Sequence, residues 1–227
     1  MISLLLLCFA SLAVVAWSLH RDRTVGAFTE QILLPLYVSF LLPIFCLCYA
    51  AASIAGDRED QTLAYLLVTP LPRPAVYTAK YATAMLLTSV WTLGTMAILC
   101  RLAGPAGRSA FRLFWPAVLW STLAYVGLFH LFSAAFRRAT IVALTYSLFL
   151  ETFLGNMPGM VKRVAVSFYT QCLIYDAAAP LGLGPAGSHN PGLFLPVTGR
   201  TAWLVLCVLA GGLFLAGMWL FCRREYA

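Results

Sequence analysis

The sequence predicts an all-α membrane protein with six transmembrane helices. Of its 227 residues, 62% are hydrophobic and only 10% are charged, whereas about 25% of the residues in an average soluble protein are charged. Several apolar runs reach the roughly 20 residues that a helix needs to cross the hydrocarbon core of a bilayer. A soluble domain of this length could not bury so much apolar surface. The composition therefore excludes a soluble enzyme, a disordered chain and a small disulfide-linked domain.

Six apolar segments account for the predicted transmembrane helices. The first lacks the basic start of a signal peptide, and its apolar region is long and its cleavage site weak for one, so we expect it to stay in the protein as an anchor. An even number of spans places both termini on the same side of the membrane. We expect residues 1–227 to form a single transmembrane domain, with spans at residues 2–19, 32–55, 81–103, 113–136, 140–154 and 202–222.

Residues 155–200 separate the fifth predicted span from the sixth and are expected to lie at the outer face. Residues 155–159 contain two glycines and a proline, which end the fifth span. Residues 164–179 are too short and too polar to cross the membrane. They predict a re-entrant or interfacial helix, because irregular backbone at membrane depth is tolerated only where protein buries it.

The charges and the cysteines set further bounds. The net charge of +7 is expected at the lipid headgroups and does not indicate nucleic-acid binding. The seven cysteines lie mostly in apolar runs without a CxxC pair, so they are predicted to be small hydrophobic residues. The three histidines lie in three separate segments, which argues against a metal site. We expect no metal and no cofactor in this chain.

The distribution of basic residues leaves the orientation open. With the C-terminus inside, seven basic residues lie inside: Arg58, Arg73, Lys80, Arg137, Arg138, Arg223 and Arg224. Eight lie outside: Arg21, Arg23, Arg101, Arg108, Arg112, Lys162, Arg163 and Arg200. A difference of one residue cannot decide the orientation by the positive-inside rule.

The polar segment between the second and third predicted spans, residues 56–80, is the most informative. Gly56 suits the end of a helix, and Asp57 suits the N-cap of the next one. Three leucines then share one face of a short amphipathic helix: Leu63, Leu66 and Leu67. Two interpretations stay open, a surface helix that only connects two spans and a helix that docks a soluble partner.

Residues 53–80 resemble the cytosolic loop of ABC-2-type transporter permeases. The shared pattern is an acidic-Arg-acidic start, Thr-Leu, a run of leucines, Thr-Pro-Leu, a basic residue and a lysine near the next span. In this sequence it falls on Asp57, Arg58, Glu59, Thr62, Leu63, Leu66, Leu67, Thr69, Pro70, Leu71, Arg73 and Lys80. Residues 154–176 are also similar to a stretch in some bacterial members.

The resemblance implies a permease that forms the transmembrane pathway of an exporter in the bacterial inner membrane, with both termini cytosolic. A separate ATP-binding cassette subunit would bind and hydrolyse ATP, so this chain is not expected to be an enzyme. The other implied partner is a second copy of the chain or a homologous permease. The residues implied to dock the ATPase subunit are Asp57, Arg58, Glu59, Thr62, Leu63, Leu66, Leu67 and Arg73.

Glu151 lies near the outer end of the fifth predicted span. A carboxylate at mid-membrane costs about 2.5–3.5 kcal/mol on insertion scales, so it is rarely accidental. One interpretation is a contact that lines or gates the pathway. The other is a carboxylate that reaches the membrane interface or pairs with Lys162 or Arg163.

Two other function classes stay open. An intramembrane enzyme could use Asp176, His189 or Glu151, but these residues have no nucleophile–base or metal-ligand spacing. A membrane scaffold without transport activity is the second. In the sixth predicted span, Gly212 and Ala216 form a small-xxx-small pair, which predicts helix packing there.

Overall fold

The computed structural model describes residues 2–20, 24–51, 53, 56, 72–136, 138–154, 161–182 and 197–223. These residues form helices and turns, with no strand among them. Five helices are long and apolar enough to cross a membrane: Ile2–Leu19, Val25–Ala51, Arg73–Leu102, Pro105–Ala135 and Gly199–Arg223. They confirm the prediction of an all-α membrane protein.

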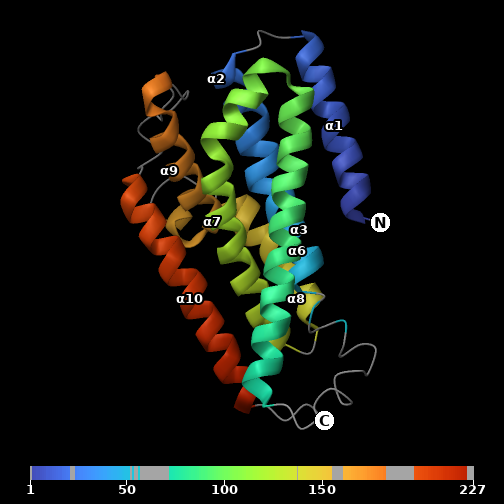
Figure 1. Ribbon diagram of the computed structural model, residues 1–227, viewed down its shortest axis with the longest axis vertical. Coiled ribbons are helices and arrows are strands. Elements are labelled where there is room, and N and C mark those ends of the chain that lie inside the picture. The colour runs from blue at the N-terminus through green and yellow to red at the C-terminus, as the bar shows by residue number, and fades with distance from the viewer. Residues whose placement is uncertain are drawn as a thin grey trace.

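The helices form an elongated bundle (Figure 1). Helices α6 (Arg73–Leu102) and α7 (Pro105–Ala135) run antiparallel through its centre. Helix α1 (Ile2–His20) lies on one flank and α10 (Gly199–Arg223) on the other. The turn between α6 and α7 marks the upper end in Figure 1, and the start of α6 and the end of α10 mark the lower end.

The second span consists of four consecutive helical pieces, two of them with wide π-type turns. Pro35 interrupts the first of these two pieces, and Pro43 lies in the first turn of the next helix. Proline lacks a backbone N–H, so it breaks the regular hydrogen-bond ladder at both places. The four pieces are α2 (Val25–Phe28), η1 (Thr29–Leu41), α3 (Leu42–Cys46) and η2 (Leu47–Ala51).

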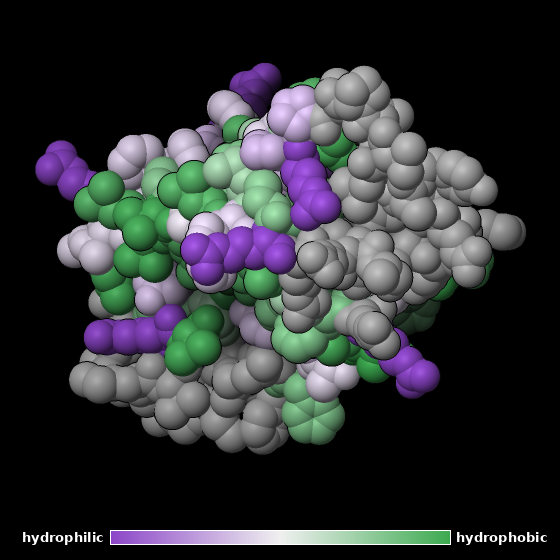
Figure 2. Space-filling view, turned by 90° about the horizontal axis from the view of Figure 1, so that it is seen from below, coloured by the Kyte–Doolittle hydropathy of each residue, from purple (hydrophilic) through white to green (hydrophobic). Residues whose placement is uncertain are grey.

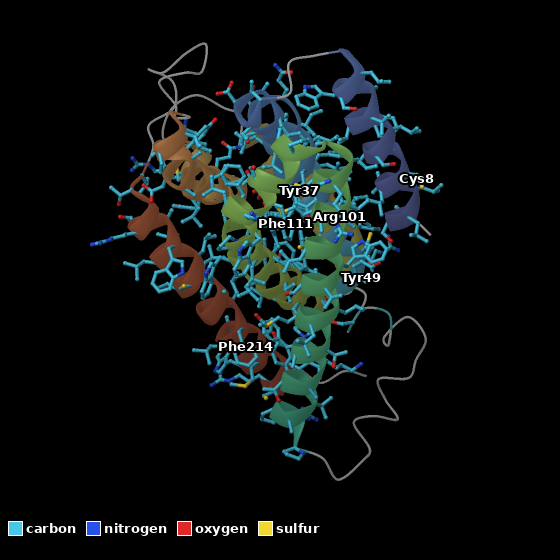
Figure 3. All side chains as sticks on the ribbon, turned by 45° about the horizontal axis from the view of Figure 1, so that its top comes forward. Cys8, Tyr37, Tyr49, Arg101, Phe111 and Phe214 are labelled. Atoms are coloured by element: carbon cyan, nitrogen blue, oxygen red, sulfur yellow. The ribbon has the colours of Figure 1, made fainter. Side chains whose placement is uncertain are left out.

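This second span lies inside the bundle, unlike α1. The Tyr37 side chain is 1% exposed, and its hydroxyl donates to the Thr92 carbonyl of α6 at 2.5 Å. Figure 3 shows Tyr37 among the central helices, whereas Cys8 projects from the outer side of α1. All seven cysteines are free thiols.

Helices α6 and α7 extend beyond the apolar runs that predicted them. α6 begins at Arg73 rather than at residue 81, and α7 begins at Pro105 rather than at residue 113. Pro74 and Pro105 both lie in a first helical turn, where a missing N–H costs nothing. Gly104 joins the two helices with a φ of 78°, which favours glycine. The 30 residues of α6 span about 45 Å, more than the roughly 30 Å of hydrocarbon.

The region of the fifth predicted span is helical but short. It comprises α8 (Ala139–Thr145) and η3 (Tyr146–Leu154). The predicted number of six spans therefore stays a prediction, because this region is shorter than the other five.

A helix does follow between the fifth and sixth predicted spans. α9 (Val166–Ala178) lies between two short 3₁₀ turns, η4 (Val161–Val164) and η5 (Ala179–Leu181). Figure 1 shows α9 beside the upper part of α7 and close to the start of α10. Its helical nature agrees with the prediction for residues 164–179, while its re-entrant depth stays a prediction.

Helices α7 and α10 approach closely at two glycines. A Cβ atom on Gly127 would lie 3.3 Å from the Leu213 Cβ. A Cβ atom on Gly217 would overlap the Tyr77 hydroxyl of α6. A Cβ on Gly212 would meet open space, and Ala216 is exposed. The small residues that pack α10 within the described chain are therefore not the Gly212–Ala216 pair that the sequence suggested.

We expect Gly217→Val to lower the free energy of unfolding by about 1–3 kcal/mol, because the new methyl groups overpack the contact with Tyr77. Gly212→Val is the matched control in the same helix and should change it by less than about 0.5 kcal/mol. The thermal unfolding midpoints of both variants in detergent test this. Equal midpoints would contradict the observed packing of α10.

The flanks of the bundle remain apolar and open. In the most apolar 18-residue stretch of each helix, only 22% of α1 and 17% of α10 is buried inside the bundle, against 67% of α7. Figure 2 shows the lower end, where separate hydrophilic side chains project among hydrophobic ones. The two outer helices therefore offer apolar faces to lipid or to another membrane helix.

Candidate functional site

The predicted docking segment is only partly described. Seven of the eight predicted docking residues lie outside the described residues: Asp57, Arg58, Glu59, Thr62, Leu63, Leu66 and Leu67. The flanks are described, with Ser53 and Gly56 before the segment and Arg73 and Lys80 after it. The predicted docking helix itself therefore stays a prediction, and the structure describes only the residues that flank it.

Arg73 joins the start of α6 to the end of α10. Its Nη1 donates to the Cys222 carbonyl at 3.3 Å. Arg223 in the same last turn of α10 lies over the Trp219 ring, 4.2 Å from the ring centroid. A positive charge near the C-terminal end of a helix is favourable because it faces the negative end of the helix dipole.

Lys80 lies about two turns into α6, and its side chain contacts the second span. Its Nζ donates to the Ser53 carbonyl at 3.2 Å. The Ser53 hydroxyl in turn lies 2.9 Å from Nδ1 of His130 on α7. His130 is fully buried and packs against the rings of Tyr77 and Tyr81, with centroid distances of 4.9 and 5.4 Å. The residues flanking the docking segment therefore lie in one contact network with α6 and α7.

Glu151 does not reach the surface, because its side chain is fully buried. Its Oε1 accepts hydrogen bonds from the Tyr125 hydroxyl at 2.5 Å and from the backbone N–H of Ser167. Tyr146 also faces this carboxyl group. In this conformation, the carboxyl group therefore lies inside the protein between α7, η3 and α9, and the interpretation of an interfacial carboxylate does not hold.

Through its contact with Ser167, Glu151 caps the N-terminal end of α9. Ser167 lies in the first turn of α9, where backbone N–H groups have no partner within the helix. The N-cap residue Ala165 has no side chain that could accept from them. Glu151 supplies this acceptor from a different element. Oε2 of Glu151 and Oγ of Ser167 are buried without a hydrogen-bond partner.

A second polar contact ties α9 to α7. The Ser121 and Thr170 hydroxyls lie 2.5 Å apart, and both residues are fully buried. Nothing in the spacing of these two residues indicates that they meet. Ser121 and Thr170 are 49 positions apart in the sequence, so only the tertiary packing brings them together.

The basic residues beside α9 lie in η4. Lys162 is buried, with its Nζ 5.7 Å from the centroid of the Phe168 ring. Desolvation lowers the pKa of Lys162 below its ordinary value, and the nearby Cys172 opposes this shift.

Asp176 and Glu151, two of the three residues that an intramembrane enzyme could use, contact the first turns of two different helices, α10 and α9. The Asp176 carboxyl group contacts Gly199 in the first turn of α10, where it faces the positive end of that helix. His189 lies outside the described residues. The described part of the chain holds no group of three or more His, Cys, Asp or Glu side chains that could bind a metal ion.

Comparison with known proteins places the chain in a family. Residues 2–225 match the family described as "ABC-2 family transporter protein", which covers nearly the whole chain. No curated protein matches the sequence. The family match agrees with the resemblance in residues 53–80 and with the long apolar helices. The chain is therefore a multi-pass membrane protein of the ABC-2 transporter family, an ABC-2-type permease.

Proposed function

We propose that the chain is the permease subunit of an ATP-driven exporter and that a separate ATP-binding cassette subunit binds and hydrolyses the ATP. The family match over residues 2–225 carries this proposal. The sequence also contains no GxxxxGK[ST] motif, so it lacks the loop that cradles phosphates in such ATPases. Without a cofactor of its own, the permease would contribute the pathway and the other subunit the energy.

The ATPase subunit would dock on the segment from Asp57 to Arg73. This segment leads into α6, whose start lies at the lower end of the bundle in Figure 1. Its leucines at positions 63, 66 and 67 would form the apolar contact, with Asp57, Arg58, Glu59, Thr62 and Arg73 adding polar ones. The lower end would then face the cytosol of a bacterial cell, together with both termini.

The pathway would be completed by a second copy of the chain or by a homologous permease. The apolar faces of α1 and α10 support this, since less than a quarter of each apolar window is buried within one copy. Glu151 would act as a gating contact. It links η3 to the first turn of α9.

Purification from native membranes tests the proposal. The tagged permease should bring an ATP-binding cassette subunit with it, and the reconstituted complex should hydrolyse ATP in a vanadate-sensitive manner. A scaffold or an intramembrane enzyme would be purified without such a subunit. Absence of both the subunit and the ATPase activity would contradict the proposed function.

A further inference from the structure

Three carbonyl groups near the last described residues of the second span accept hydrogen bonds from side chains. Here the Ala50 carbonyl accepts from the Ser53 hydroxyl at 2.9 Å. The Ala51 carbonyl accepts from Ser133 of α7 at 2.9 Å, and the Ser53 carbonyl accepts from Lys80 of α6 at 3.2 Å. Two of these three donors therefore belong to other helices.

Ser133 links two helices through a single hydroxyl group. Its Oγ lies 2.9 Å from the Ala51 carbonyl and 3.0 Å from the Phe129 carbonyl of its own helix. The hydroxyl hydrogen is thus shared between the second span and α7. A displacement of the end of the second span would change this bond directly.

His130 adds a second bond from α7 to the same helix end. Nδ1 of His130 lies 2.9 Å from the Ser53 Oγ, which also lies 2.9 Å from the Ala50 carbonyl. Its Nε2 is buried without a hydrogen-bond partner. Ring contacts with Tyr77 and Tyr81 fix the imidazole in this orientation.

The same part of α6 also touches α10. The Tyr77 hydroxyl lies against Gly217, and the Tyr81 ring packs on Phe214 with a centroid distance of 4.7 Å. Figure 3 shows Phe214 on the lower half of α10, where that helix approaches α6. The end of the second span is therefore connected through α6 to α10 as well as directly to α7.

We propose that Lys80, His130 and Ser133 form a clamp on Ala50, Ala51 and Ser53, the last described residues of the second span, which positions the docking segment and passes its movement to α6 and α7. Within this clamp, the ammonium group of Lys80 makes a charge-assisted hydrogen bond to the Ser53 carbonyl. These are positioning residues, since none of them belongs to the predicted docking set. The transmission role rests on the proposed function, whereas the clamp itself does not.

Hydrogen exchange on the permease alone tests the clamp. Ser133→Ala removes the bond to Ala51, so the amides of Leu47–Ala51 should exchange severalfold faster than in the wild type. Ser109→Ala is the matched control, because Ser109 lies in the same helix and also donates to the carbonyl four residues before it. It should leave these amides unchanged. Equal exchange in both variants would overturn the clamp.

The complex with the ATPase subunit tests transmission. ATP with vanadate should change amide exchange in α7 and α10 of the wild-type permease and of Ser109→Ala. Ser133→Ala should still bind the subunit but lose more than half of this response. Lys80→Met should lose it too, and Lys80→Arg, which keeps the donor charge, should retain it.

A full response in both Ser133→Ala and Lys80→Met would overturn the transmission role. A wild-type permease that binds no ATPase subunit would instead contradict the proposed function. The exchange measurement on the permease alone would still show whether the clamp exists. Failure of the clamp and failure of the proposed function can therefore be distinguished.

Discussion

Glu151→Leu is expected to lower the free energy of unfolding by about 2–6 kcal/mol, because two buried donors lose their acceptor at about 1–3 kcal/mol each. These donors are the Tyr125 hydroxyl and the backbone N–H of Ser167. No other side chain at the N-cap of α9 can replace the carboxyl oxygen. The first turn of α9 should therefore fray, and its amides should exchange faster.

Two control variants separate this effect from a loss of charge alone. Glu151→Gln keeps an oxygen in the position of Oε1, so it should retain most of the stability. Glu30→Leu removes an exposed carboxylate near the start of the second span and should be close to neutral. Thermal unfolding in detergent and hydrogen exchange of Val166–Ala178 measure the outcome. Wild-type stability in Glu151→Leu would show that the carboxyl group does not hold α9.

The cost of burying a carboxylate identified Glu151 as a residue of interest, but it could not show what the carboxylate binds. The hydropathy of a sequence indicates the free-energy cost of placing a charge in the membrane. It cannot predict the contact with Ser167, because Ser167 follows residues 155–160 in the sequence and meets Glu151 only through the tertiary packing of α9. The pairing of Ser121 with Thr170 was unpredictable for the same reason, since both are ordinary hydroxyl residues within helices.

Apolar runs located the long helices but not their ends. An apolar run long enough to cross the hydrocarbon does not include charged residues. Four charged residues therefore lie outside the predicted spans although they are helical: Arg73, Lys80, Arg108 and Arg112. A helix continues into water wherever its backbone bonds and flanking contacts allow it, and Lys80 is held by the Ser53 carbonyl. Proline positions were more informative at these ends, because Pro74 and Pro105 both lie in first turns.

Small residues alone did not identify the packed face of α10. Gly212 and Ala216 have the spacing of a helix-packing pair, yet Gly127 and Gly217 make the close contacts. A helix with glycines on several faces offers several possible packing surfaces. The choice among them depends on the complementary side chain, here the Tyr77 ring of α6, which no local pattern in α10 contains.

Leu66→Arg is expected to abolish binding of the ATPase subunit while leaving the permease in the membrane. If Leu66 packs on that subunit, the variant buries an unpaired charge in the contact, at a cost of several kcal/mol. Each 1.4 kcal/mol weakens binding about tenfold, so the loss should exceed about a hundredfold. Insertion should be normal because Leu66 lies outside the predicted spans.

Two matched variants make this test specific to the docking segment. Leu181→Arg changes an exposed leucine in η5, outside the docking segment, and should leave binding intact. Glu59→Ala removes one charge and should cost only about 0–1 kcal/mol, as a partly solvated ion pair does. Pull-down of the ATPase subunit at equal membrane abundance measures all three. Full binding by Leu66→Arg would exclude a packed apolar contact at this leucine, because no such contact accommodates an unpaired guanidinium without loss.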